Sequence, residues 1–311
     1  MTAAELGHRA PVGSLGAVVT QVAGRLASVS EARWIVSHVT GLAPGSLAVT
    51  RRETVTDEHA DAIRNLAERR AAGEPLQYVL GKWAFRRLEV TVDRRALIPR
   101  PETERVVEVA LTELSRGDSA SRTGTTSRSS VVADLGTGSA VIALSLALEA
   151  PAVEVWATDL SSSALVLAQV NLTDLSGCAP DAAGRVRLAE GSWFSALPVA
   201  LEGHLDVVVS NPPYVSESEW PGLDPEIRDH EPRAALVAGP RGLEALELLV
   251  DRSLRWIAPG GSVVLELAPH QADAIADRAR RAGYVDVSVE PDLAGRPRVL
   301  RARRPHGGPA G

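Results

Sequence analysis

Cysteine is nearly absent from this sequence, since Cys178 is the only one among its 311 residues. A single cysteine can form neither an internal disulfide nor a cysteine-based zinc site, and its scarcity fits a reducing, cytoplasmic location. The seven histidines are scattered from His8 to His306 without the spacing of metal ligands. We therefore expect no metal site.

The sequence also lacks long apolar runs and an excess of positive charge. No run approaches the roughly 18 apolar residues of a membrane-spanning helix, so we expect no membrane partner. The net charge is −6, with 14 basic and 10 acidic side chains in residues 1–100, and 19 basic and 29 acidic in residues 101–311. This balance argues against a generic nucleic-acid binder, because affinity for phosphates needs excess Lys and Arg. The mildly basic front part is compatible with an acidic or RNA-associated partner, or with an ordinary solvated surface.

The most informative stretch follows a run of β-branched residues, Leu205–Val209, which predicts a buried strand of a parallel sheet. Asn211, Pro212, Pro213 and Tyr214 come directly afterwards. Two consecutive prolines cannot continue the hydrogen-bond ladder, so the backbone must leave the sheet at the carboxyl end of the strand. In open α/β sheets, ligands bind at that edge.

The side chains of this stretch suit one kind of chemistry. The Asn211 side chain and the Pro212 carbonyl offer neighbouring acceptors, because Pro213 has no N–H to occupy the latter. Two acceptors can hold both hydrogens of a planar NH2 group while Tyr214 covers its carrier, which orients a weakly nucleophilic amide or amine toward an electrophile. Asn211, Pro212 and Tyr214 are therefore candidate catalytic residues, and Asn211–Tyr214 the candidate substrate-binding segment. The alternative is that Asn-Pro-Pro only ends a strand at a turn.

Residues 1–80 are predicted to form a helical domain that recognises the substrate, because apolar residues recur there at helical spacing without catalytic groups. Ser30 is a plausible N-cap of one helix and Gly41 its end. A further helix is expected after Thr56, with acidic residues in its first turn, and continues to Gly73.

The remainder of the chain divides by composition. Residues 81–100 alternate with period two and predict a β-hairpin linker. The main domain is expected over 101–304, and its first helix near Pro101, since proline favours the first helical position. Residues 115–130 contain no large apolar residue and are expected to form a flexible surface loop. The tail, 305–311, is expected to be disordered.

Alternating strand and helix patterns follow, and they predict a doubly wound sheet of about seven strands. Parallel strands are expected at 131–134, 153–158, 186–189, 205–209 and 262–267, helices at about 140–149, 162–175, 242–257 and 271–282, and a closing antiparallel pair at 285–289 and 298–301.

A glycine-rich turn separates the first of these strands from its helix and is a candidate cofactor loop. It consists of Gly136, Thr137, Gly138, Ser139 and Ala140. Glycines let a ligand approach the backbone, and a helix N-terminus offers unpaired N–H groups. The third glycine of a dinucleotide fingerprint is missing, and no lysine follows as in a nucleotide-triphosphate loop. A ligand with a ribose but no phosphate fits better, and S-adenosylmethionine is the common one.

Two residues at neighbouring strand ends complete this candidate site. Asp159 ends the second strand, where its carboxylate can accept hydrogen bonds from ribose hydroxyls. Trp193 follows the third strand, where its ring can pack against an adenine. The alternatives are a helix-capping acid and a core tryptophan.

Together these residues resemble the release-factor glutamine methyltransferases, the PrmC/HemK family, from about Glu74 to Leu300. The most discriminating match is Ile98–Glu104, Ile-Pro-Arg-Pro-Glu-Thr-Glu, whereas Asn-Pro-Pro-Tyr is shared with adenine and other amine methyltransferases. The other matching pieces are Pro75–Tyr78 with Gly81, Asp134–Ser139, Ser192–Phe194, Asn211–Val215, Glu231–Pro232, Leu236–Gly239 and Asp292–Arg296.

The resemblance implies a seven-stranded Rossmann-like, class I S-adenosylmethionine-dependent methyltransferase domain, preceded by a small helical domain and a β-hairpin linker. It implies methylation of the side-chain amide nitrogen of the glutamine in the Gly-Gly-Gln motif of class I peptide-chain release factors. Gly136–Ala140, Asp159, Trp193 and Asn211 would bind the cofactor, and Asn211–Tyr214 the glutamine. The helical domain would dock the release factor, and we expect a monomer.

The chain departs from the family pattern at two alanines, because Ala140 and Ala268 stand where glycine is usual. If residue 140 needs a positive φ, its methyl group costs on the order of 1 kcal/mol and crowds the cofactor, whereas in a helical conformation it costs little.

Three other functions remain open from the sequence. An adenine-N6 nucleic-acid methyltransferase would use the same Asn-Pro-Pro-Tyr chemistry, but it would need a basic groove. A glutamine methyltransferase acting on another protein would share every site residue. A catalytically silent scaffold is favoured only by Ala140 and opposed by the intact Asn211–Tyr214.

Overall fold

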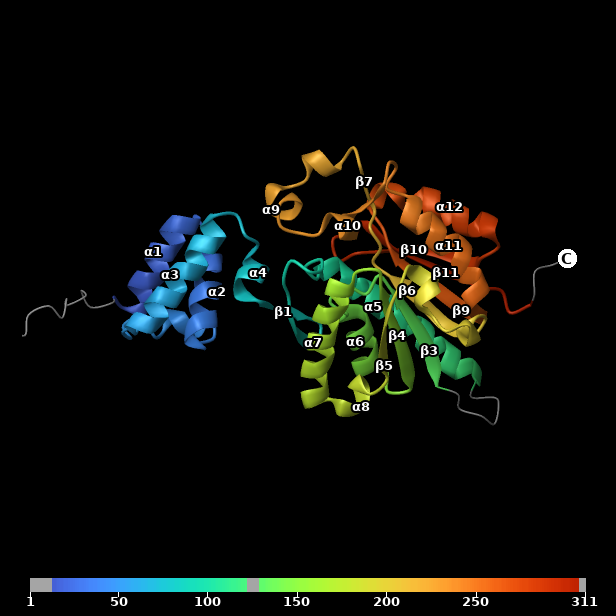
Figure 1. The fold of residues 1–311 in the computed structure, drawn as a ribbon, viewed down its shortest axis with the longest axis horizontal. Helices are drawn as coiled ribbons and strands as arrows, with labels where there is room; N and C mark the ends of the chain where they lie inside the picture. The colour runs from blue at the N-terminus through green and yellow to red at the C-terminus, as the bar shows by residue number, and fades with distance from the viewer. Residues whose placement is uncertain (1–12, 122–128, 308–311) are drawn as a thin grey trace, which may run out of the picture. The chain divides into compact units, whose positions relative to one another are not determined.

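The computed structural model describes residues 13–121 and 129–307. The chain forms two compact units, Met1–Gly81 and Lys82–Gly311 (Figure 1). No helix among the described residues is both long enough and apolar enough to cross a membrane.

The first unit consists of helices whose buried faces pack on one another. Its helices are α1 (Leu15–Leu26), α2 (Val29–Thr40), α3 (Asp57–Ala71), α4 (Leu76–Leu80) and the short 3₁₀ turn η1 (Ser46–Ala48). Ile35 and Val36 of α2 and Ile63 of α3 are almost fully buried, so the apolar stripes seen in the sequence form this core.

The ends of these helices agree only partly with the sequence predictions. Thr56 caps α3, and Gly41 ends α2 with φ 71°, both as expected. The N-cap of α2 is Ser28, whose side chain accepts the N–H of Glu31, so the assignment to Ser30 was wrong. The helix α3 ends at Ala71, before Gly73.

The second unit begins with a hairpin of β1 (Lys82–Phe85) and β2 (Leu88–Thr91), followed by α5 (Pro101–Ser121). The helix α5 starts at the predicted proline. It continues seven residues into the segment predicted to be a loop, so the prediction for 115–121 was wrong. Once a helix is nucleated by its buried stripe, each added residue gains a hydrogen bond at small cost, even without apolar side chains. Residues 122–128 lie outside the described part of the chain.

A seven-stranded sheet forms the centre of this unit, in the order β10-β11-β9-β6-β3-β4-β5. Its strands are β3 (Ser130–Leu135), β4 (Val153–Asp159), β5 (Val186–Glu190), β6 (Leu205–Ser210), β9 (Ile257–Glu266), β10 (Val285–Pro291) and β11 (Pro297–Arg303). The first five run parallel, and β11 pairs antiparallel with both β9 and β10. The predicted doubly wound sheet with a closing antiparallel pair is confirmed.

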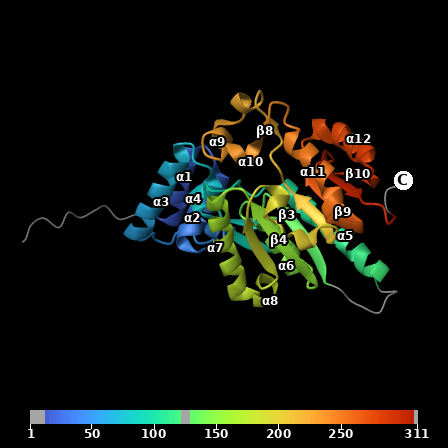
Figure 2. The same ribbon diagram turned by 45° about the vertical axis from the view of Figure 1, so that its right-hand side comes forward.

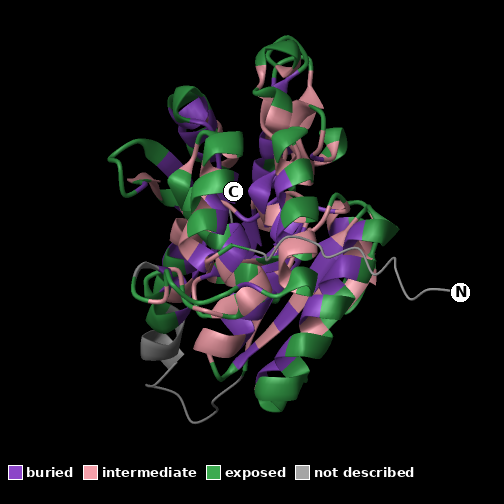
Figure 3. Cartoon of the chain, turned by 90° about the vertical axis from the view of Figure 1, so that its left-hand side faces the viewer, coloured by how far each residue is buried: buried purple, intermediate pink, exposed green. Residues whose placement is uncertain are grey.

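Helices cover the sheet, and their buried sides form its core (Figures 2 and 3). They are α6 (Val141–Glu149), α7 (Ser162–Cys178), α8 (Pro180–Ala183), α11 (Glu244–Trp256) and α12 (Ala272–Ala282), with 3₁₀ turns η2 (Trp193–Ala196), η3 (Val199–Leu201) and η5 (Pro269–Gln271). The helix α5 lies against β6, β9 and β11, and α12 lies against β10 and β11. Central strand residues such as Val208 and Val263 are fully buried.

A long excursion leaves the sheet after β6 and returns at α11. It contains β7 (Val215–Ser216), η4 (Trp220–Gly222), α9 (Pro225–Arg228), α10 (Arg233–Leu236) and β8 (Val237–Gly239). The strands β7 and β8 pair in parallel, which closes the excursion on itself.

Candidate functional site

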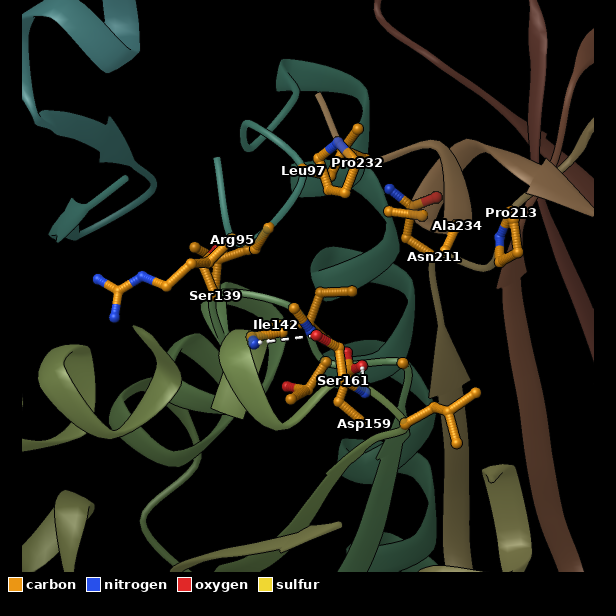
Figure 4. A pocket seen from close by; sticks show the side chains of 18 of the residues that line it. Arg95, Leu97, Ser139, Ile142, Asp159, Ser161, Asn211, Pro213, Pro232 and Ala234 are labelled. Atoms are coloured by element: carbon orange, nitrogen blue, oxygen red, sulfur yellow. Dashed lines mark hydrogen bonds between the residues drawn. The ribbon is translucent and has the colours of Figure 1, made fainter. Parts of the chain in front are cut away.

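A cavity of about 450 Å³ opens at the carboxyl ends of β3, β4 and β6 (Figure 4). This size suits a ligand of small-molecule dimensions, for which sites of roughly 300–1,000 Å³ are usual. The predicted site residues that line it are Gly136, Thr137, Gly138, Ser139, Asp159, Trp193, Asn211 and Pro213. Ala140, Pro212 and Tyr214 are absent from its lining.

Hydrogen bonds to the end of β4 shape the glycine loop. The N–H groups of Gly136 and Thr137 both donate to the carbonyl of Thr158 at 2.8 Å. The glycines have φ values of 73° at Gly136 and 57° at Gly138, a region that strains other residues. The loop therefore presents its backbone to the cavity without side chains at these two positions.

Asp159 holds this loop directly. Its Oδ2 accepts the N–H of Gly138 at 2.9 Å, and its Oδ1 accepts the N–H of Ser161 at 2.8 Å. Each carboxylate oxygen has a second lone pair, so Asp159 can still accept from a ligand hydroxyl. The helix α7 is capped by Ser161, whose side chain accepts the N–H of Ala164, and not by Asp159.

Ala140 adopts the left-handed conformation, with φ 67°, as the N-cap of α6. The strain expected for a positive φ therefore applies, on the order of 1 kcal/mol, whereas the crowding expected with it does not. The methyl group of Ala140 is fully buried and does not line the cavity, so it does not crowd a ligand there. Ala268 has φ −76° and ψ 146°, an extended conformation in which alanine is unstrained.

Trp193 forms a wall of the cavity beside the glycine loop. A Cβ atom placed on Gly136 would lie 3.4 Å from Cζ3 of Trp193, so the ring packs against the bare backbone. Trp193 is itself strained, with φ 51°, and partly buried against the main core. Trp193 therefore both lines the cavity and contacts the core, and its packing against an adenine stays a prediction.

Asn211 follows β6 and is held by Thr103, which belongs to the Ile98–Glu104 match but was not among the predicted site residues. Its Nδ2 donates to Oγ1 of Thr103 at 3.0 Å, and the Thr103 hydroxyl donates to Oε2 of Glu266 at 2.7 Å. The hydroxyl of Tyr214 donates to the other oxygen, Oε1, at 3.3 Å. Tyr214 thus turns toward Glu266 and not into the cavity.

Burial and neighbouring charge set the protonation of this cluster. Burial raises the pKa of Glu266, while the Thr103 hydroxyl, Arg298 and the Tyr214 hydroxyl favour its ionised form. Burial, and next the charge of Glu266, raise the pKa of Tyr214, so its phenol stays protonated at neutral pH. A carboxylate in a buried strand is uncommon, and this was the sequence signal that could have identified Glu266.

Asp134, at the end of β3, is a second buried carboxyl group. Burial raises its pKa to about 7, against the hydrogen bonds that its Oδ2 accepts from Thr137 at 2.6 Å and from the N–H of Ala143 at 3.2 Å. Its Oδ1 has no hydrogen-bond partner within the described ranges. Asp134 therefore holds the glycine loop through Thr137, and its raised pKa leaves a substantial protonated fraction at neutral pH.

Glu231 holds the part of the cavity wall that is formed by Ile98 and Arg100. Its Oε2 accepts the N–H of Ile98 at 3.1 Å, and its Oε1 accepts from the guanidinium of Arg100. The neighbouring Pro232 lines the cavity (Figure 4). The excursion after β6 is therefore tied to the segment before α5, a contact between residues more than a hundred positions apart.

The cavity fits the ligand expected from the sequence. Bare glycine backbone, a carboxylate and an indole ring are suited to a nucleoside, and the loop carries no basic side chain for a phosphate. In the described part of the chain no cluster of three or more His, Cys, Asp or Glu side chains is placed to hold a metal ion.

Comparison with known proteins agrees with this assignment. Residues 20–81 match the model of the PrmC N-terminal domain, and residues 121–221 match that of the methyltransferase small domain. The solved hMettl16 catalytic domain shares the fold, with a TM-score of 0.51 at 13% identity, covering 82% of this chain and 84% of that one.

Curated relatives are similar over nearly their whole length. The release factor glutamine methyltransferase of Deinococcus radiodurans is 38% identical over 296 residues, 93% of this chain and 98% of that protein. The protein of the same name from Streptomyces coelicolor is 36% identical, covering 93% and 97%.

The order of the strands, the glycine loop and these similarities together show that the protein is an S-adenosylmethionine-dependent methyltransferase. More closely, the chain belongs to the family of release factor glutamine methyltransferases. The family resemblance inferred from the sequence is thereby confirmed.

Proposed function

We propose that this protein transfers the methyl group of S-adenosylmethionine to the side-chain amide nitrogen of the glutamine in the Gly-Gly-Gln motif of class I peptide-chain release factors. The observation that carries the proposal is the position of Asn211. It lines the same cavity as the glycine loop and Trp193, and its Nδ2 is turned toward Thr103. Its acceptor oxygen is thus available to a substrate NH2 group.

Each part of the cavity has a role in this proposal. Gly136–Ser139, Asp159, Trp193 and Asn211 would hold the methyl donor, which supplies an electrophilic methyl group on a sulfonium sulfur, while Ala140 ends the loop as the N-cap of α6 outside the cavity lining. The Oδ1 of Asn211 and the carbonyl of Pro212 accept the two hydrogens of the glutamine NH2 and orient its nitrogen. The nitrogen–carbon bond forms as the sulfur–carbon bond breaks, and the amide then loses one proton to solvent. No general base among the protein side chains is needed.

The helical unit completes the proposal as the docking element for the release factor. Residues 20–81, which lie in this unit, match the model of the PrmC N-terminal domain. We place the reaction in the cytoplasm and expect the protein to act as a monomer.

A direct transfer experiment tests the proposal. Labelled S-adenosylmethionine is supplied with an unmethylated class I release factor, with its Gln-to-Ala variant at the Gly-Gly-Gln motif, and with DNA and RNA, and mass spectrometry locates the label. We expect label on that glutamine alone. Label on nucleic acid would favour the adenine alternative. Label on a glutamine of another protein, and none on the release factor, would reject the proposed substrate.

A further inference from the structure

The hydroxyl group of Thr103 lies between an amide and a carboxylate. It receives the N–H of Asn211 at 3.0 Å and donates to Glu266 at 2.7 Å. Thr103 is 3% exposed and Glu266 1% exposed, so solvent does not substitute for either partner. The contact joins α5, the end of β6 and the end of β9, three segments distant in sequence.

The direction of the two hydrogen bonds that link Asn211, Thr103 and Glu266 follows from the number of protons on the Thr103 hydroxyl. A hydroxyl has one proton to donate and lone pairs to accept with. The Thr103 hydroxyl donates its proton to Glu266, so only lone pairs of Thr103 face Asn211. An amide meets lone pairs with its NH2 group, which turns the oxygen of Asn211 the other way.

Other groups around Glu266 support its acceptor role. Arg298, on the neighbouring strand β11, attracts the ionised form, and the hydroxyl of Tyr214 donates to Oε1. Burial is the largest influence on this carboxyl group and raises its pKa, and the charge of Glu102 acts in the same direction. The carboxylate thus has donors on both oxygens and a cation close by.

We propose that Thr103 and Glu266 are positioning residues that fix the amide of Asn211 with its oxygen toward the substrate. This inference rests on the proposed function, in which the oxygen of Asn211 accepts a hydrogen bond from the substrate amide. A flipped Asn211 would present NH2 hydrogens to the NH2 hydrogens of glutamine, and the two donors would repel. Thr103 lines the cavity, but in this proposal both it and Glu266 act through Asn211 and not on the substrate or the donor.

The orientation can be measured without any substrate. The chain has three asparagines, Asn65, Asn171 and Asn211, so selective ¹⁵N-asparagine labelling gives three side-chain NH2 signals. We expect Thr103→Val to speed the exchange of the Asn211 NH2 protons with water at least about fivefold, because it removes their acceptor. Thr103→Ser should restore the slow exchange.

The same spectra contain their own control for folding. The Nδ2 of Asn171 donates to the carbonyls of Ser139 at 2.9 Å and Thr91 at 3.1 Å, away from Thr103. Its signals should not change in either variant. Equal exchange of the Asn211 protons in wild type and Thr103→Val would overturn the proposal, as would a serine variant that behaves like valine.

Kinetics then connect the orientation to transfer. With the release factor as substrate, Thr103→Val should lower kcat by about ten- to a hundredfold, since a loosened Asn211 misaligns the nitrogen, while the KM for S-adenosylmethionine changes less than about threefold. Thr103→Ser should recover most of the rate. The matched control is Thr112→Val on the same helix, whose exposed hydroxyl donates only to the carbonyl of Glu108, and its kcat should equal that of wild type.

The outcomes separate this inference from the proposed function. A wild type that methylates glutamine, together with an equally active Thr103→Val, rejects the positioning role alone. A wild type without transfer rejects the proposed function, and the NH2 exchange of Asn211 then still decides whether Thr103 holds its amide.

Discussion

The backbone N–H of Gly138 donates a 2.9 Å hydrogen bond to Oδ2 of Asp159. The acidic residue at the end of β4 therefore shapes the loop that follows β3, in addition to any contact with a ligand. The second oxygen accepts the N–H of Ser161, so both oxygens of Asp159 bind backbone donors. Loop geometry and ligand affinity should consequently depend on the same carboxylate.

Asp159→Asn tests this dependence. An asparagine keeps one oxygen, and its NH2 group faces one of the two N–H donors unfavourably. We expect the affinity for S-adenosylhomocysteine, measured by titration calorimetry, to fall about ten- to a hundredfold. Asp174→Asn, at an exposed position on α7, is the control and should bind like wild type. Unchanged affinity in Asp159→Asn would contradict the assigned role.

The position of Trp193 predicts a fluorescence response. It is the tryptophan that lines the described cavity, although the sequence has six. Adding S-adenosylhomocysteine should change the emission of wild type, because a stacked adenine alters the surroundings of the indole. Trp193→Phe should abolish the change, and Trp34→Phe in the helical unit should leave it intact. A full response in Trp193→Phe would show that another tryptophan senses the ligand.

Local sequence patterns predicted the elements that local chemistry determines. The strand that precedes Asn211, the glycine loop after β3 and the start of α5 at Pro101 lie where the residues indicated. Each is set by neighbours in sequence, such as a proline that cannot pair or a glycine that tolerates positive φ.

The contacts that were missed are long-range. Thr103 and Glu266 are 163 residues apart, and Ile98 and Glu231 are 133 apart. No local pattern brings such pairs together, because their meeting depends on the strand order. The wrong cap of α2 has a different cause, since Ser28 and Ser30 are both good N-caps and only the packing of the helix distinguishes them.

Substitution of Asn211 tests the acceptor directly. Asn211→Ala should lower kcat for methyl transfer by roughly a hundred- to a thousandfold, the effect typical of losing one preorganised hydrogen-bonding group. The fold should persist, because the Asn211 side chain is only partly buried and its hydrogen bond goes to the side chain of Thr103. Comparable turnover by the variant and wild type would refute the acceptor mechanism, provided that circular dichroism shows both proteins folded.

Because Ala140 is strained, we expect its replacement by glycine to lower the free energy of unfolding unusually little. Ala140→Gly relieves the left-handed conformation, worth about 1 kcal/mol, and this offsets the loss of a buried methyl group, worth about 0.8 kcal/mol. We expect the free energy of unfolding to stay within about 0.5 kcal/mol of wild type. Ala147→Gly is the matched control, since Ala147 is equally buried but helical, and it should lose about 1.5–2 kcal/mol. Denaturant titration distinguishes the two, and equal losses would contradict the strain.

Asp134 predicts a dependence of stability on pH. Its pKa is raised to about 7 in the folded protein by burial, whereas an unfolded aspartate titrates near 4. Between these values the folded state binds more protons than the unfolded state, so this group's contribution to stability is complete below about pH 4 and is lost as the pH rises toward 7. The slope reaches at most about 1.4 kcal/mol per pH unit.

Asp134→Asn removes this titration and leaves a neutral amide. The amide oxygen of the asparagine can take the place of Oδ2 and still accept from Thr137 and Ala143. Its NH2 group then takes the place of Oδ1, the oxygen without a partner, at a cost that does not vary with pH. The variant should therefore be less stable than wild type near pH 4 and gain on it steadily up to pH 7. Other carboxylates titrate equally in both proteins, so the difference between their unfolding free energies isolates Asp134. Parallel stability curves over this range would mean that Asp134 is ionised in the folded protein, and that its buried charge is compensated by the loop donors alone.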